Sequence, residues 1–145
     1  MAKSLFYRLF GVGKMPAQLA ATLKSEGVRL LDEGIKASVT YLNFRAPGRH
    51  SDWRRQWFTA SIAITETRLV ALMYSNTAIN VPLTDERLRK MQFSVEEDGT
   101  LLISFDPALF HTDWSGTMEY RFKTEQAQAF LDKLHERTLM SVPPA

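Results

Sequence analysis

The chain has 145 residues, enough for one ordinary domain with its own core, and it contains no cysteine, which excludes disulfide scaffolds, cysteine-ligated metal sites and thiol nucleophiles. The net charge of +2 is too small to indicate nucleic acid by itself, although residues 1–55 carry a net charge of +6 and residues 56–145 a net charge of −4. The longest apolar run, 69–74, is far shorter than the roughly 18 residues that a membrane-spanning helix needs.

The first 27 residues show helical spacing of apolar side chains. One face of an expected first helix carries Leu5, Phe6, Leu9 and Phe10. A second helix is expected to begin at Pro16 and to end at Gly27, with Leu19, Ala20 and Leu23 buried. We therefore expect residues 1–27 to form a helical extension whose apolar face packs on the domain, on a second copy of the chain or on an anionic membrane.

From Val28 onward the spacing changes to the alternation typical of β-strands. Strands are expected at 38–44, 57–65, 68–74, 78–83, 93–95, 101–105 and 118–122. Asp98-Gly99 is typical of a two-residue hairpin turn, and Pro82 is expected at a sheet edge or strand end because proline cannot donate to a ladder. A final amphipathic helix is expected from about Thr124 to Thr138, with Ala127, Phe130, Leu131 and Leu134 on its apolar face.

Seven short antiparallel strands have many edges to protect. We therefore expect the sheet to close into a barrel or a two-sheet roll, with the last helix filling the open corner. The predicted fold is mainly β (α+β), with a helical extension at 1–27, a barrel and its helix at 28–138, and a flexible tail at 139–145.

Two segments in this order resemble a known family. The run 62–70 (IAITETRLV), followed by 79–83 (INVPL), is similar to a hairpin and the following strand of bacterial pleckstrin-homology-like and GRAM-like domains. The similarity extends over roughly 28–138, including the closing helix, and leaves out residues 1–27. It implies a seven-stranded antiparallel barrel or roll capped by a C-terminal helix, acting as a binding module in a bacterial cell.

The segment 45–57, expected to be the loop between the first two strands, is the main candidate for ligand binding. It gathers basic and aromatic side chains that could bind an anion, namely Arg45, Arg49, His50, Trp53, Arg54, Arg55 and Trp57. In eukaryotic pleckstrin-homology domains the corresponding loop binds phosphoinositide headgroups through a Lys/Arg-x-Arg pattern, whereas Arg54 and Arg55 are adjacent here. Strand alternation places Arg54 on the same face as Phe58 and away from Arg55. The alternative interpretation is a solvated hairpin tip whose tryptophans shield the rim of the barrel.

Motifs that carry chemistry are absent from the sequence. Gly11-Val12-Gly13-Lys14 does not satisfy a phosphate-binding loop, and His50, His111 and His135 lack the spacing of a metal site. No nucleophile elbow or zinc-protease motif occurs. We therefore predict no catalytic residue, no metal and no cofactor, and a protein that is not an enzyme.

Three functions remain open. The first is a non-catalytic interaction module that binds a protein partner or another copy of itself. The second is a peripheral membrane binder that recognises anionic headgroups through 45–57. The third is a small-molecule-binding protein or enzyme with a pocket in the barrel mouth. Single-stranded nucleic acid is not expected, because the C-terminal part of the chain is acidic. Arg8 interrupts the first apolar run, so no secretory signal is expected and the protein is placed in the cytoplasm, either free or peripheral at a membrane.

Overall fold

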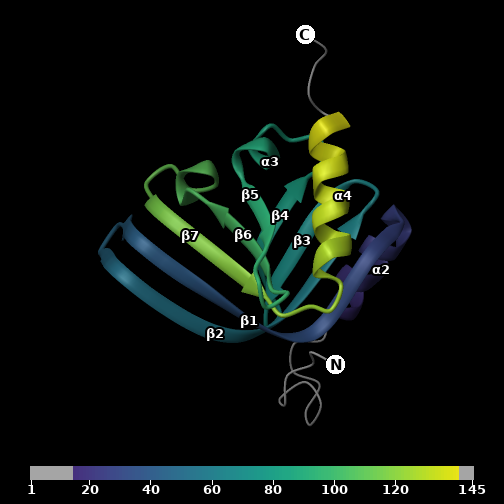
Figure 1. Cartoon of the computed structure of the whole chain (residues 1–145), viewed down its shortest axis with the longest axis horizontal. Helices are drawn as coiled ribbons and strands as arrows, with labels where there is room; N and C mark the ends of the chain where they lie inside the picture. The colour runs from purple at the N-terminus through teal and green to yellow at the C-terminus, as the bar shows by residue number, and fades with distance from the viewer. Residues whose placement is uncertain (1–14, 141–145) are drawn as a thin grey trace.

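The computed structural model describes residues 15–140, with side chains up to residue 136 (Figure 1). The expected first helix and its apolar face, Leu5, Phe6, Leu9 and Phe10, therefore lie outside the described residues. The C-terminal residues 141–145 also lie outside them.

The described chain is mainly β, as the sequence predicts, and its strands form one strongly curved sheet. They are β1 (Val28–Ala46), β2 (Arg49–Thr65), β3 (Arg68–Met73), β4 (Asn76–Pro82), β5 (Gln92–Val95), β6 (Leu101–Phe105) and β7 (Ser115–Phe122). Their order across the sheet is β4-β3-β2-β1-β7-β6-β5, and every neighbouring pair is antiparallel. Each half of the sheet is a meander of sequential strands, and the pairing of β1 with β7 joins the halves.

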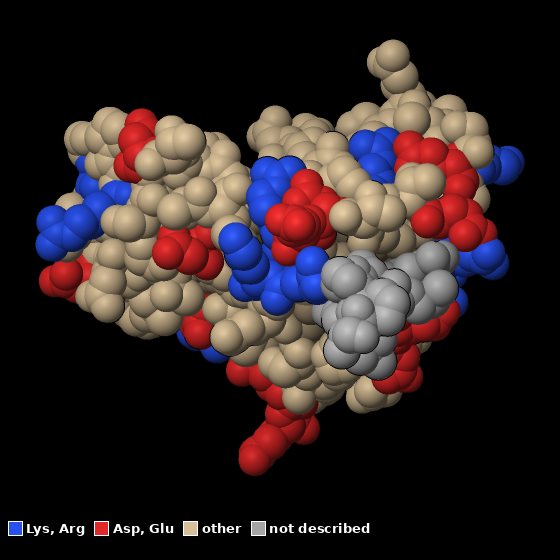
Figure 2. Space-filling view, turned by 90° about the horizontal axis from the view of Figure 1, so that it is seen from above, with Lys and Arg blue, Asp and Glu red and all other residues tan. Residues whose placement is uncertain are grey.

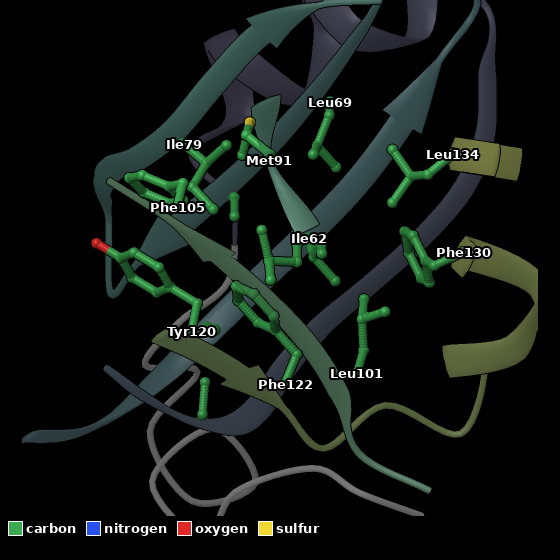
Figure 3. Close-up of a cluster of buried hydrophobic side chains, with 14 of the residues drawn as sticks. Ile62, Leu69, Ile79, Met91, Leu101, Phe105, Tyr120, Phe122, Phe130 and Leu134 are labelled. Carbon is green, nitrogen blue, oxygen red and sulfur yellow. The ribbon is translucent and has the colours of Figure 1, made fainter. Parts of the chain in front are cut away.

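The sheet does not close, so the expectation of a closed barrel is wrong. β4 and β5 remain at its two edges. Between them the chain forms the short helix α3 (Arg87–Lys90), and the C-terminal helix α4 (Ala127–Met140) packs against β5 and β6. Phe130 and Leu134 of α4 point into the buried cluster (Figure 3). Because the helix covers the interior, the core is shielded from water although no hydrogen-bonded ladder joins the two edge strands. Pro82 is the last residue of β4, as expected.

The first hairpin is much longer than expected. β1 and β2 pair as far as Ala46 and Arg49, with only Pro47 and Gly48 between them (Figure 1). The register shifts of this pair lie near the start of β1, between Val28 and Leu30 and between Asp32 and Ile35. Residues 45–57 are therefore not a loop: from Arg49 onward they belong to β2. The sequence misled because this part of β2 is exposed on nearly every residue and shows no apolar alternation. It is a strand because its backbone hydrogen-bonds to β1, whose other edge is paired with β7.

The two faces of the sheet carry separate clusters of buried side chains. The concave face holds the main core, to which β2 contributes Phe58, Ala60, Ile62 and Ile64. On the convex face, Ala63, Val70 and Leu72 pack with Met15 and Leu23, and this cluster ties helix α2 (Ala17–Glu26) to β2 and β3. Of the elements that the structure describes, α2 covers one end of the convex face.

The two helices lie close to their predicted positions, and single residues differ from the prediction. Pro16 precedes α2, and Gly27 ends it with a φ of 87°, but Ala20 is exposed rather than buried. In α4, Ala127, Phe130 and Leu134 are buried and Leu131 is half-buried. This helix begins at Ala127, so Thr124 does not cap it directly; its hydroxyl donates to the Asp32 carboxylate at 2.7 Å.

One turn differs from its expected form. Asp98 and Gly99 belong to a five-residue connection between Val95 and Leu101, in which the Thr100 amide donates to the Asp98 carboxylate at 3.1 Å. The connection is therefore longer than the two-residue hairpin turn that the Asp-Gly pair predicts. By contrast, β3 and β4 are joined by a two-residue turn, Tyr74 and Ser75, and Tyr74 has a φ of 56°, a positive value that such hairpin turns require.

Helix α2 is also held to the sheet by one carboxylate. The two oxygens of Glu26 accept from the Arg68 guanidinium at 3.0 and 2.8 Å, and the Thr67 and Thr65 hydroxyls also donate to it. The hydrogen bond from Arg68 is the main cause that lowers the pKa of Glu26. A carboxyl with a lowered pKa stabilises the fold above its unfolded pKa, roughly 4.3, and loses that contribution as the pH falls through the folded value.

We therefore expect Glu26→Gln to be destabilised at neutral pH and equal to wild type in stability at a pH low enough to protonate Glu26 in the fold. The expected loss is only about 1 kcal/mol because the side chains of the pair are about one fifth exposed. Urea unfolding at pH 7 and at pH 3 measures the difference, with the exposed Glu97→Gln as a control. A constant difference at both pH values would contradict the ionic role of Glu26.

Candidate functional site

The tip of the first hairpin carries three of the predicted ligand-binding residues, spread apart by the strand geometry. Arg45 and His50 are register partners, and the His50 imidazole lies 3.1 Å from the Asp52 carboxylate. The Arg49 guanidinium lies 6.0 Å from the centre of the Phe44 ring. Acidic and aromatic neighbours thus occupy this tip, and the three side chains do not converge on one point.

The two adjacent arginines lie on opposite faces of β2, as the alternation predicts. Arg54 is the register partner of Tyr41 and lies on the same face of β2 as Phe58. Arg55 is the register partner of Thr40 and lies on the same face as Trp53 and Trp57. The predicted set is therefore divided: Trp53, Arg55 and Trp57 share the convex face, and Arg54 belongs to the other.

Trp53, Arg55 and Trp57 form the surface that we call the tryptophan face. The two tryptophans are 61% and 56% exposed, the highest values among the exposed large hydrophobic side chains of the described residues. They are four residues apart on one strand, hence about 13 Å apart along it. The Arg55 guanidinium lies 5.4 Å from the Trp53 ring centre while its Nε donates to the Thr40 hydroxyl at 2.9 Å. Arg55 is thus held between a ring and a hydroxyl.

Basic side chains from neighbouring strands extend this face. The Lys123 ammonium lies 5.9 Å from the centre of the Trp57 ring, and Lys36 is on the same face of β1. The acids of this face, Glu96 and Glu119, are both paired with Arg121, at 2.9 and 3.1 Å. Among the described residues, no carboxylate lies within ion-pair distance of Arg55, Lys36 or Lys123. Lys123 nevertheless interacts with Asp98, whose pKa is lowered by hydrogen bonds to Thr100 and by the charge of Lys123. Arg55 and Lys36 thus carry the positive charge of this face that no carboxylate of the described chain neutralises.

Two buried hydroxyls belong to the same face. Ser38 is the register partner of Trp57 and of Arg121, and Thr40 that of Arg55 and Glu119. Both are nearly inaccessible, and the Ser38 hydroxyl has no hydrogen-bond partner among the described residues. Sequence reasoning missed Ser38, Thr40 and Lys123, because only the register of β1, β2 and β7 brings them to the tryptophans. The spacing of 53, 55 and 57 was the one available signal.

The concave side of the sheet holds a second candidate, which we call the aromatic pocket. Its volume is about 330 Å³, and it opens between the β3–β4 turn and the segment that leads into β7. The side chains around it are mostly aromatic or apolar: Tyr41, Met73, Asn76, Thr77, Ala78, Phe105, Phe110, His111, Trp114, Met118 and Tyr120. A pocket lined by aromatic residues in the barrel mouth was one of the expectations from the sequence, but its residues were not identified.

The rings of this pocket support one another in two rows. Tyr120 stacks on Phe105 with 5.9 Å between ring centres, and Phe105 meets Phe110 edge to face at 5.3 Å. On the other side, Trp114 meets the Phe44 ring edge to face at 5.4 Å and stacks on His111 at 3.7 Å. Such contacts hold the rings in defined orientations, so the pocket is formed in advance of any ligand.

The histidines do not assemble a metal site in the described part of the chain. His50 lies beside Asp52 and His111 on Trp114, and no group of three or more histidine, aspartate or glutamate side chains is gathered among the described residues. None of the helices within these residues combines the length and apolar character needed to cross a membrane.

Comparison with known proteins gives no assignment for this site. No protein-family model matches the sequence, and no curated protein is significantly similar to it.

Proposed function

We propose that this protein is a non-catalytic binding module of the pleckstrin-homology-like or GRAM-like type, and that its tryptophan face docks on an acidic segment of a partner protein. Two features support the family assignment. One is the meander of four strands joined through β1 to a meander of three, and the other is the C-terminal helix packed on the sheet. The open edge between β4 and β5 departs from a closed barrel.

The observation that carries the docking site is the pair of exposed tryptophans beside a positioned arginine. Tryptophan and arginine are the residues most enriched among those that dominate binding energy at protein interfaces. Because Thr40 and the Trp53 ring already hold Arg55, little side-chain freedom is lost on binding. The charges of Arg55 and Lys36, which no carboxylate of the described chain neutralises, favour an acidic partner.

A protein surface fits this geometry better than a membrane. Trp53 and Trp57 lie in the middle of a strand, whereas the hairpin tip that protrudes consists of Ala46, Pro47, Gly48 and Arg49. A sheet face can be covered by another protein, but it cannot insert its rings into lipid without bringing the neighbouring acids, Glu96 and Glu119, to the same surface. Membrane binding and self-association are therefore outcomes that the test must separate.

Trp57→Ala is expected to weaken the binding of a protein ligand by about 30-fold or more, because a central tryptophan contributes roughly 2 kcal/mol or more at such interfaces. Ligands are selected from a random peptide library displayed on phage against the full chain, and their affinities are measured for wild type and variants. The selected peptides are expected to be rich in aspartate and glutamate.

Arg54 and Arg55 provide a matched pair for the same experiment. Arg55→Glu should abolish binding of the selected acidic peptides, whereas Arg54→Glu, on the opposite face, should retain it. Peptides that bind Trp57→Ala and wild type equally would refute the docking site. Binding to phosphatidylglycerol vesicles that disappears in Trp57→Ala, without any selected peptide, would establish a membrane function instead. A dimer in light scattering that Trp57→Ala converts to a monomer would identify a second copy as the partner.

A further inference from the structure

The function proposed for the tryptophan face does not use the aromatic pocket, which lies on the opposite side of the sheet. Its size, about 330 Å³, is at the lower end of the range of small-molecule sites, roughly 300 to 1,000 Å³. Rings of both rows line it, together with Met73 and Met118. Rings held in fixed orientations favour a flat apolar body that stacks on them.

The charges around the pocket restrict the ligand further. Among residues 15–140, its lining contains no lysine, arginine, aspartate or glutamate. The Arg87 guanidinium lies 4.8 Å from the Phe110 ring centre and is neutralised by the Asp85 carboxylate at 2.7 Å. Arg54, the register partner of Tyr41, is exposed on the same side of the sheet but is not among the lining residues. A charged ligand would therefore lose its hydration without gaining a counter-ion, which is strongly unfavourable. The pocket favours a neutral molecule.

One polar group in the pocket is left without a partner. Tyr120 is only 4% exposed, and its hydroxyl makes no hydrogen bond to any residue that the structure describes. Figure 3 shows that hydroxyl at the margin of the buried cluster, directed away from Ile62 and Phe130. Among the described residues the Ser38 hydroxyl is the one fully buried side-chain group without a partner, so the Tyr120 oxygen is still accessible and can donate to a molecule in the pocket that it lines. A tyrosine hydroxyl is protonated at neutral pH, and burial raises the pKa of Tyr120 further, so this group is a donor.

We propose that the aromatic pocket binds a neutral, planar small molecule whose hydrogen-bond acceptor receives the proton of the Tyr120 hydroxyl. An aromatic ketone is the simplest compound of this class. Its ring stacks on the aromatic side chains of the pocket, and its carbonyl oxygen faces Tyr120. The side chains of Tyr41, Asn76 and Thr77, which also line the pocket, define its polar rim.

The methionines make this proposal directly measurable in the full chain. Met73 and Met118 line the pocket, whereas Met15 and Met91 are buried elsewhere and serve as internal controls. With methyl-labelled methionine, the NMR signals of Met73 and Met118 are followed during titration with acetophenone, 1-indanone and 1-tetralone. The matched hydrocarbons ethylbenzene, indane and tetralin have similar shapes and lack the acceptor. The expected result is a shift of Met73 and Met118 alone, with the ketone bound more tightly than its hydrocarbon.

Tyr120→Phe tests the hydrogen bond, because it keeps the stacked ring and removes only the hydroxyl. This variant is expected to weaken ketone binding by about 3- to 10-fold, which is the effect of one hydrogen bond between neutral groups. The affinity for the matched hydrocarbon is expected to change by less than about twofold. Ala78→Leu fills the pocket from the edge strand β4 and is expected to abolish binding of all six compounds. Unchanged signals of Met15 and Met91 verify that each variant is folded.

Three results would overturn the proposal. The first is the absence of any shift of Met73 and Met118 with every ketone. The second is an equal effect of Tyr120→Phe on ketone and hydrocarbon, and the third is unchanged binding in Ala78→Leu. Trp57→Ala should bind the ketones like wild type, so the outcome here is independent of the docking function proposed for the tryptophan face.

Discussion

Gly116→Ala is expected to lower the free energy of unfolding by about 3 kcal/mol or more, from backbone strain together with overpacking. Gly116 has a φ of 109°, which side-chain-bearing residues rarely adopt. A Cβ at this position would lie 2.4 Å from the Asn43 carbonyl oxygen and 2.7 Å from that of Leu42. These are backbone atoms of β1 that cannot turn aside as a flexible side chain could.

This close approach occurs where β1 bends. The β1–β7 register shifts between Leu42 and Arg45, and Asn43 in that interval has a φ of 48°. The bend follows Tyr41 and brings Phe44 against Trp114, so the geometry of the aromatic pocket depends on it. Gly116→Ala should therefore weaken ketone binding as well as stability.

Gly99→Ala is the matched control for this prediction. Gly99 also has a positive φ, 85°, but nothing lies within 4 Å of the position that its Cβ would take. Gly99→Ala is expected to lower the free energy of unfolding by about 1 to 2 kcal/mol, because it introduces backbone strain without overpacking. Urea unfolding measures both variants. Equal losses for Gly116→Ala and Gly99→Ala would show that the contact with β1 does not matter.

Phe130→Ala is expected to cost about 3 to 5 kcal/mol, the range for removing a fully buried phenylalanine side chain. Phe130 is 0% exposed and comes from α4, the helix that packs on β5 and β6 beside the open side of the sheet (Figure 3). The large effect is expected because α4 replaces the missing strand ladder between β4 and β5. If the sheet were complete without α4, the removal of one side chain from this helix would change the free energy of unfolding much less.

The control for Phe130 is on the opposite side of the same helix. Gln128 is exposed and bonds only to Asp132, one turn further along. Gln128→Ala should change the free energy of unfolding by no more than about 0.5 kcal/mol. The two variants are compared by urea unfolding with tryptophan fluorescence. A loss below about 1 kcal/mol for Phe130→Ala would contradict the role of α4 as part of the core.

The tryptophan face illustrates how far a local pattern can locate a site. The spacing of Trp53, Arg55 and Trp57 and the opposite parity of Arg54 follow from strand alternation alone. Their setting does not: Thr40 and Ser38 lie opposite them through the register of the β1–β2 hairpin, and Lys123 reaches Trp57 from the residue after β7. The pocket is an extreme case, since Tyr41, Met73, Phe105 and Tyr120 come from four strands and no motif connects them.

The amino-acid sequence alone determined the mainly β composition of the chain, most strand positions, the Gly27 end of α2 and the buried face of α4, because each depends on the spacing of neighbouring side chains. Only the tertiary structure decided that the sheet stays open and that Arg49–Trp57 is strand rather than loop. It also decided which hydroxyls lie buried beside the tryptophans and in the pocket. These features depend on pairing between β1, β2 and β7 and on the packing of α4, and contacts of that range leave no periodic trace in the order of residues.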